Sequence, residues 1–449
     1  MELLDLAADV VARAGARGAS DAECVVREGA EFSVRVRLGE VEQIKEAGSK
    51  AMGLRVLQGK RAASAYTSDF SAAGVEKLLA SALEIVPHTS EDPFAGLPEA
   101  GEFGFGADPA SLNLYDDSIL GLSSEEKIDM VRRAEQAALE TDPRITNSDG
   151  ASFGSGWGCW VLANSRGFSG EYRSSSCSLS VSPLAEDAGS KERDYWYTLG
   201  RSPAGLEAPE RVGQIAAERA LRRLHPTKVA TTKVPIVFEP RIARSLLGHI
   251  LSAVSGDAIY RQASFLAGQL GRQVAAPNIT IVDDGLRPGG FGSSPFDDEG
   301  VATRRTTVLR EGVLESYLLN SYTARKLGLK TTGNASRGLA GNPGVGAGNF
   351  MLSPGEFSPE EIIRSVQNGF YVTELMGFGV NLVSGDYSRG AAGFWIENGE
   401  IGFPVSEVTI AGNLKQMLLD VEMIGSDLDF QSSVIVPTIK IREMIVAGK

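Results

Sequence analysis

The chain has 449 residues, of which 43% are hydrophobic and 22% are charged, and its net charge is −13. The length favours two domains over one ordinary hydrophobic core, and the composition is typical of a globular protein. The acidic balance argues against non-specific binding to nucleic acid and against docking on anionic membranes, since both need a basic surface.

The N-terminus carries early acidic residues, Glu2 and Asp5, and lacks the basic start and long apolar run of a signal peptide. No later apolar run reaches the length needed to span a bilayer. The sequence therefore predicts a cytoplasmic protein.

The first half of the chain alternates helical and strand-like patterns. Apolar residues recur at helical spacing over 2–15, 71–86, 124–141 and 208–224. Strand-like runs lie between these segments, at 32–44, at 53–57, at 61–66 and between 144 and 200. Residues 88–118 are rich in Pro, Gly and Asp, which predicts a long surface connection.

A new buried strand is predicted at 233–240, directly after His225-Pro226, so we place a domain boundary at residue 226. This divides the chain into an N-terminal domain, 1–226, and a C-terminal domain, 227–449. A helix is expected at 241–255, followed by short strands between glycine-rich loops, at 278–283, 302–310, 313–319, 350–352, 371–375, 393–397, 400–404 and 435–442. The pattern favours an α+β fold, with a mixed antiparallel sheet and helices in the first domain and a strand-rich second domain.

Histidine is scarce, with three residues in the whole chain. His249 lies on the helix expected at 241–255, but a zinc-binding helix needs a second histidine about one turn on and a glutamate beside the first. Ile250 follows His249, and no histidine comes later. The three cysteines are widely spaced and indicate neither a disulfide framework nor a zinc ribbon. The residues therefore assign no catalytic group and no metal or cofactor site to this chain.

Two polar clusters are candidates for chemistry. Asp297, Asp298 and Glu299 are adjacent acids that either hold a hard cation or form a solvated turn, and the alternate spacing of a calcium loop is missing. The segment 384–390 gathers an acid, a phenol, a hydroxyl and a guanidinium between glycines. It is expected to be a loop, which either is stabilised by its own Asp–Arg hydrogen bonds or holds a peptide or faces a partner.

Several segments resemble the TldD/PmbA family. They are Ser255-Gly-Asp-Ala-Ile-Tyr-Arg261, Phe296-Asp-Asp-Glu-Gly-Val301, the run from Gly385 to Glu400, and Pro404-Val-Ser-Glu-Val-Thr-Ile-Ala-Gly-Asn-Leu414. The resemblance runs along essentially the whole chain, and residues 385–414 are its most specific part.

In the TldD branch, a His-Glu-x-x-x-His zinc motif precedes a Glu-Gly-Asp segment, and a cysteine ligand lies near the C-terminus. The corresponding stretch here reads Leu247-Gly-His-Ile-Leu-Ser252 before Ser255-Gly-Asp257, and no cysteine follows Cys177. These differences resemble the TldE (PmbA) branch. The resemblance implies a zinc-free subunit, inactive alone, that acts with a zinc-bearing TldD partner on unfolded or extended peptides. Members of the family are often called modulators of DNA gyrase.

The candidate contacts to substrate or partner follow from these motifs. They are Asp257, Tyr260, Arg261, Asp298, Glu299, Asp386, Tyr387, Ser388 and Arg389. Two alternatives remain open. One is a self-sufficient hydrolase that uses a metal held by Asp297, Asp298 and Glu299, and the other is a non-enzymatic homodimer that binds peptides.

Overall fold

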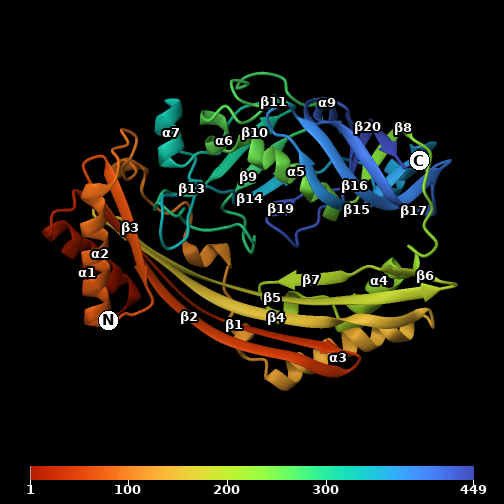
Figure 1. The fold of residues 1–449 in the computed structure, drawn as a ribbon, viewed down its shortest axis with the longest axis horizontal. Helices are drawn as coiled ribbons and strands as arrows, with labels where there is room; N and C mark the ends of the chain where they lie inside the picture. Colours follow the sequence, from red (N-terminus) through yellow and green to blue (C-terminus); the bar gives the residue numbers. More distant parts are fainter. Residues whose placement is uncertain (1, 449) are drawn as a thin grey trace.

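The computed structural model describes residues 2–448. A long, curved antiparallel sheet forms the first half of the chain, and a strand-rich second half lies over one face of this sheet (Figure 1). The α+β fold expected from the sequence is confirmed. Across residues 2–448, no helix has the length and apolar character that crossing a membrane requires.

The N-terminal sheet has the strand order β3-β2-β1-β4-β5-β6, and β7 pairs with β5. Its strands are β1 (Asp21–Arg37), β2 (Glu40–Gln58), β3 (Arg61–Thr67), β4 (Ile145–Asn164), β5 (Ser169–Asp187), β6 (Ser190–Arg193) and β7 (Trp196–Gly200). The β1–β2 turn has Leu38 and Gly39 at positive φ, 49° and 80°, as the tightest hairpins require. Strands β1 and β2 extend well beyond the runs predicted at 32–44 and 53–57.

Four helices cover the other face of this sheet: α1 (Leu3–Ala16), α2 (Ala72–Ile85), α3 (Ser124–Thr141) and α4 (Pro209–Leu221). Cys24 and Val26 of β1 pack with α1 and α2, whereas Val34 and Val36 pack with α3 and α4. Because side chains alternate along a strand, even-numbered residues of β1 face the helices. Odd-numbered residues such as Glu23 and Arg27 therefore face the second half of the chain.

The connection at 88–118 is more than the surface segment expected from its composition. It contains three short 3-10 turns, at Ala100–Glu102, Pro109–Leu112 and Asp117–Leu120, after a first turn at Val86–His88. Ala95, Leu97, Leu112 and Leu114 are buried. The segment thus packs against the core through widely spaced apolar residues. Because these residues do not recur at the spacing of a helix or a strand, their burial could not be predicted from the sequence.

The second half contains two main sheets, with strand orders β17-β16-β15-β8-β20-β18 and β11-β10-β9-β14-β19, and the small pair β12-β13. An additional β17–β20 pairing closes five strands of the first sheet into a ring. The strands are β8 (Thr232–Phe238), β9 (Ile281–Asp284), β10 (Arg305–Arg310), β11 (Val313–Leu314), β12 (Ala335–Ser336), β13 (Gly344–Val345), β14 (Asn349–Leu352), β15 (Asn368–Val380), β16 (Asp386–Glu397), β17 (Glu400–Asn413), β18 (Val421–Ile424), β19 (Val434–Ile435) and β20 (Ile439–Ala447).

Helix α5 (Pro240–Val254) packs its apolar face on the main core of this half. The shorter helices are α6 (Gly256–Tyr260), α7 (Ser321–Leu327), α8 (Pro359–Arg364) and α9 (Leu414–Leu419). The strand expected at 313–319 ends at Leu314, because Tyr317 and Leu318 turn into the core and Asn320 caps α7. The predicted division at residue 226 falls between α4 and β8, and it stays a prediction.

Polar contacts tie the two halves together at both ends of the sheet. At one end, Glu23 accepts hydrogen bonds from Arg55 of β2 and Arg337, both at 2.6 Å. At the other end, Arg219 of α4 pairs with Glu239, which precedes α5, at 3.0 Å. These contacts fix the second half over the sheet.

Candidate functional site

Two cavities lie at the junction between the N-terminal sheet and the second half of the chain. The turn 297–299 stands between them: Asp297 and Asp298 line the first cavity and Glu299 lines the second. The sequence singled out this turn, but it did not show that the turn separates two cavities.

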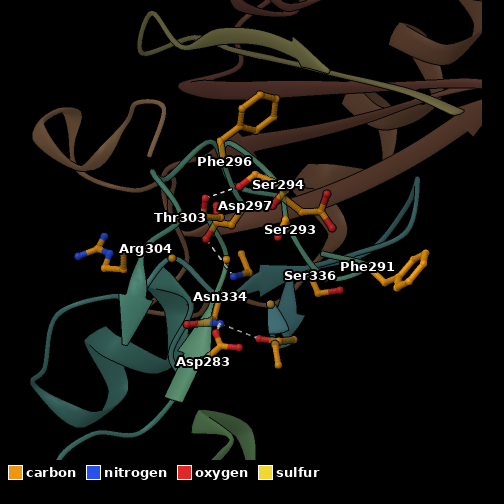
Figure 2. A pocket seen from close by; sticks show the side chains of 18 of the residues that line it. Asp283, Phe291, Ser293, Ser294, Phe296, Asp297, Thr303, Arg304, Asn334 and Ser336 are labelled. Carbon is orange, nitrogen blue, oxygen red and sulfur yellow. Dashed lines mark hydrogen bonds between the residues drawn. The ribbon is translucent and has the colours of Figure 1, made fainter. Parts of the chain in front are cut away.

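We call the first cavity the acidic pocket; its volume is about 190 Å³. It is lined by the floor residue Tyr172 of β5 and by polar groups of the second half, chiefly Asp283, Ser294, Asp297, Asp298, Thr303, Asn334 and Ser336, with glycine backbone between them. Figure 2 shows the labelled polar side chains of the second half around the pocket, with Arg304 pointing away from Asp283 and Asn334. Strand β9 brings Asp283 to the pocket.

Asp283 is the most unusual group of the acidic pocket. Its side chain is 2% exposed, and its Oδ2 accepts a hydrogen bond from Asn334 Nδ2 at 2.7 Å. Its Oδ1 is buried and has no hydrogen-bond partner among the described residues. Burial raises the pKa of Asp283 to about 6, although Asn334 and the nearby Gly348 amide favour the charged form.

The acidic turn is not the solvated turn considered from the sequence, because Asp297 and Glu299 are 5% and 2% exposed. Asp297 Oδ1 accepts from the backbone amides of Glu299 and Val301, and Oδ2 accepts from the amide of Ala335, all at 2.9 Å. Burial and then the neighbouring Glu299 charge raise the pKa of Asp297. This carboxylate organises the turn by accepting from three backbone amides.

Asp298 and Glu299 point into different surroundings. Asp298 accepts from Arg27 of β1 at 3.1 Å and from the Arg337 amide at 2.8 Å. Glu299 accepts from the Ser321 amide at the start of α7, at 2.9 Å, and burial raises its pKa. Because the three acids are engaged separately, the turn does not present them as one set of ligands.

The second cavity, which we call the junction cavity, has a volume of about 500 Å³. It brings together four residues singled out from the sequence: Asp257, Tyr260, Arg261 and Glu299. Arg55 and Asp92 face them from the first half of the chain, and Tyr322 and Arg325 of α7 complete the wall. The cavity therefore carries charges of both signs.

Hydrogen bonds order the wall of the junction cavity. Tyr322 donates to Asp92 at 2.8 Å, and Arg261 donates to the Tyr260 hydroxyl at 2.8 Å. Arg325 donates to three carbonyls of the segment 94–97, at 2.8–3.3 Å. Asp257 accepts from the Val345 amide at 3.3 Å. Arg325 thus fastens the long connection to the second half of the chain.

The remaining candidates from the sequence lie on β16, where a loop was expected. The segment is a strand from Asp386 onward because it pairs with both β15 and β17. Asp386 bonds to Ser384 Oγ at 2.6 Å and Asn413 at 3.2 Å, and the Ser384 bond is the main cause of its lowered pKa. Ser388 is exposed. Neither cavity includes these residues.

Arg389 does not bond to Asp386 as one interpretation of the sequence had it. It donates instead to Ser245 Oγ of α5 at 3.1 Å and to the Met376 carbonyl at 3.3 Å. Tyr387 is buried, and its ring lies edge-on to His249 of α5 with centroids 6.1 Å apart. These two residues thus connect β16 to α5.

A zinc site on α5 does not fit the residues present. His249 is the one His, Cys, Asp or Glu of this helix, whereas protein zinc sites use at least three such ligands. Burial and then the Arg389 charge lower the pKa of His249, and a neighbouring cation opposes metal binding. Among residues 2–448, no three His, Cys, Asp or Glu side chains are grouped so that they could hold a metal ion.

Sequence reasoning missed Asp283 and Asn334. Asp283 lies in an apolar strand pattern, Ile279-Thr-Ile-Val-Asp283. An acid at a position that alternation assigns to the buried face was a usable signal. Asn334, 51 residues away, offered none.

Comparisons with known proteins agree along the whole chain. Models of the PmbA/TldA metallopeptidase match in three consecutive parts: domain 1 at residues 22–86, the central domain at 117–224 and the C-terminal domain at 231–448. The metalloprotease PmbA of Escherichia coli O157:H7 is 41% identical over 97% of this chain and 94% of its own length.

Solved structures show the same fold. A putative modulator of DNA gyrase from Bacteroides thetaiotaomicron superposes with a TM-score of 0.92 at 28% identity, covering 99% of this chain and 98% of that one. TldE from Thermococcus kodakarensis superposes with a TM-score of 0.87 over 98% of this chain and 99% of its own. At 22% identity, the second likeness shows the fold alone.

Proposed function

The chain belongs to the PmbA/TldD metallopeptidase family, and from this premise we propose that it is the zinc-free subunit of a two-component peptidase. In this proposal, a TldD-like partner supplies the zinc and the general base. The present chain binds that partner and helps to enclose unfolded or extended peptides.

The observation that carries the proposal is the chemistry of α5. In the TldD branch this helix bears the zinc motif, whereas here the corresponding stretch is Leu247-Gly-His-Ile-Leu-Ser252. Leu247 is buried in the core and Ser252 donates to the Gly248 carbonyl at 3.0 Å. A family member that is similar over its full length but has no zinc ligands on this helix is suited to the role of a non-catalytic subunit.

The N-terminal sheet supports the peptide part of the proposal. Strand β3 stands at the edge of the sheet order, and an edge strand has unpaired backbone groups that an extended peptide can use. The two polar cavities lie at the junction between this sheet and the second half. The chain therefore offers both backbone and side-chain groups to a peptide.

The alternative of a self-sufficient hydrolase on the acidic turn has less support. Both carboxylate oxygens of Asp297 accept hydrogen bonds from backbone amides, and Asp298 accepts from the Arg27 side chain and the Arg337 amide. A hard cation needs several free oxygens from one direction. The turn presents its acids in diverging directions.

Reconstitution tests the proposal. The tagged chain is co-expressed with a family member that carries the His-Glu-x-x-x-His motif, the mass of the purified complex is measured by native mass spectrometry, and cleavage of an unfolded protein such as reduced, alkylated casein is followed. We expect a complex containing both chains and cleavage that needs both. Cleavage by this chain alone, or undiminished cleavage by the partner alone, would contradict the proposal.

Arg389→Ala tests the contribution of β16 to the pair. We expect reduced peptide cleavage by the reconstituted complex with an unchanged unfolding midpoint of this chain, because the guanidinium orients α5 and the β15 segment around Met376. Arg310→Ala is the matched control, since Arg310 pairs with Glu315 at an exposed site. Equal peptide cleavage by the two variants would show that Arg389 does not contribute to the activity of the complex.

A further inference from the structure

We infer that the acidic pocket is a binding site for a primary ammonium group, with Asp283 as the counter-ion. Such a group is carried by the N-terminus of a peptide and by a lysine side chain. The inference rests on the proposed function only in taking a peptide as the natural ligand. It is carried by one buried oxygen and by the groups around it.

The neighbours of the Asp283 carboxylate satisfy one of its oxygens and leave the other without a donor among the described residues. The carboxylate is 2% exposed and lines the pocket, and its Oδ1 has no hydrogen-bond partner among residues 2–448. A buried polar atom without a partner is costly. A small shift of the carboxylate toward the pocket would let a hydrogen-bond donor inside the pocket reach Oδ1 and remove this cost.

The other charged groups of the pocket do not compensate Asp283. Asp297 is held by three backbone amides, and Asp298 is paired with Arg27. Arg304 lines the pocket but is exposed and points away from Asp283 (Figure 2). The pocket is therefore anionic toward its interior, and it repels carboxylates and phosphates.

A primary ammonium fits this arrangement better than a metal ion does. Its single charge matches one carboxylate, and its three N–H donors suit the mixed oxygen lining that Asp283, Ser294 and Ser336 provide. Among the described residues, no three acids, histidines or cysteines converge here to hold a metal. The volume of about 190 Å³ exceeds the ~30 Å³ of one water several-fold, which leaves room for the carbon that bears the amine.

The size of the pocket also sets its specificity. Gly292 approaches Gly348 so closely that an added Cβ would lie 2.1 Å from the Gly348 carbonyl oxygen. A side chain at position 292 would therefore collide with the backbone of the facing wall, so this wall is bare backbone. Given the small volume of about 190 Å³, we expect the pocket to admit the end of a chain and to exclude a branched or quaternary ammonium.

Isothermal titration of the full chain with defined peptides tests the inference. The probes are tetraalanine amide, its N-acetylated form, and N-acetyl-alanyl-lysyl-alanine amide, which separates an N-terminal amine from a lysine amine. We expect at least one amine-bearing probe to bind about tenfold or more tightly than the acetylated tetraalanine, as loss of a charged hydrogen bond implies. Whichever amine binds identifies the source.

Asp283→Asn should abolish the difference between amine-bearing and acetylated probes. Asp284→Asn is the matched control, because it removes one charge from the same strand at a position outside the pocket, and its amide oxygen can still accept from Leu286. If Asp283→Asn does not fold, the wild-type chain gives a second test. Its preference for the amine should fade between about pH 7.5 and about pH 5, as the carboxylate takes up its proton.

The outcomes separate this inference from the proposed function. The ammonium site is overturned if neither amine-bearing probe binds more tightly than the acetylated tetraalanine. It is also overturned if the Asp283→Asn variant keeps the preference for the amine. Neither result affects whether the chain assembles with a zinc-bearing partner. Conversely, amine binding by the isolated chain without any such assembly leaves the pocket assigned and removes the two-component proposal.

Discussion

Buried carboxylates at the junction differ in how their charge is compensated. Glu23 is fully buried between two arginines, Asp297 accepts from backbone amides, and Asp283 keeps one free oxygen. Because an unpaired buried charge is unfavourable whereas a paired one holds its neighbours in place, Glu23 belongs to the framework. Asp283 is the group left available for a ligand.

Replacing Glu23 tests its role in holding the two halves together. Burial alone would raise its pKa, but Arg337 and Arg55 outweigh that effect and lower it. Glu23→Gln takes away the carboxylate that two buried guanidinium groups share, and we expect the free energy of unfolding to fall by about 3 kcal/mol or more. Urea unfolding measures this change. Glu315→Gln, at an exposed pair with Arg310, should change stability by less than about 1 kcal/mol.

Asp283 should destabilise the unliganded chain above neutral pH. Its pKa rises from 3.8 to about 6 on folding. At a pH between these two values, the carboxyl is protonated in the folded state and deprotonated in the unfolded state. Stability then falls as pH rises from about 4 to 6 and is level above that. At about 1.4 kcal/mol per pKa unit, the contribution is at most about 3 kcal/mol.

Asp283→Asn should therefore be more stable than the wild-type chain at about pH 7.5, with the gain shrinking toward about pH 4. Urea midpoints of both chains across this range measure the effect. A variant less stable than wild type at every pH would show that Asp283 is a structural acid rather than a free one.

At the residue scale, sequence reasoning reached some groups and not others. Asp257 and Tyr260 lie on the short helix α6 and Arg261 follows directly at its C-cap, so local motif similarity could bring them together. Arg55, which faces them, is about 200 positions away, and no local pattern predicts that contact. The burial of Glu299 likewise depends on the Ser321 amide, which only the fold supplies.

The packing of the helices predicts opposite effects of a Gly→Ala substitution on stability at two helical positions. In α4, a Cβ on Gly213 would lie 2.1 Å from the Ala134 carbonyl oxygen of α3, whereas a Cβ on Gly248 of α5 would meet nothing within 4 Å. Alanine in a helix interior is favoured over glycine by about 1 kcal/mol. We expect Gly248→Ala to raise the free energy of unfolding by up to that amount.

Gly213→Ala should instead lower it by about 1–2 kcal/mol, because α3 and α4 must move apart and overpacking outweighs propensity. Equal stabilisation by both substitutions, measured by thermal and urea unfolding, would mean that the two helices are not in backbone contact.

Among the secondary-structure elements, the five long helices were predictable, whereas the short helices α6 to α9 and the lengths of the strands were not. A capping box of Ser123 and Glu126 begins α3 at Ser124, in agreement with the helical spacing found over 124–141. By contrast, β16 begins at Asp386, where glycines and polar residues suggested a loop. Pairing on both sides overrides local propensity there, although the alternation of polar Asp386, aromatic Tyr387 and polar Ser388 was a strand signal.

At the scale of the whole molecule, the second half lies over the curved sheet (Figure 1). Both cavities are lined by residues of the two halves and depend on this placement. Composition and motif order predicted an α+β chain, but not the face of the sheet that is covered. That choice depends on contacts such as Arg27 with Asp298, which lie 271 positions apart. Close backbone approach also matters, since a Cβ on Gly53 of β2 would collide with the Leu339 carbonyl.

The zinc content of this chain, purified alone from zinc-replete cells and measured by elemental mass spectrometry, shows whether it is a zinc-free subunit. The zinc-bearing family member, purified in parallel, is the positive control. The account predicts less than about 0.1 zinc per chain, because α5 provides no ligand set. A value near one zinc per chain would contradict it and would make this chain a metal-binding subunit in its own right.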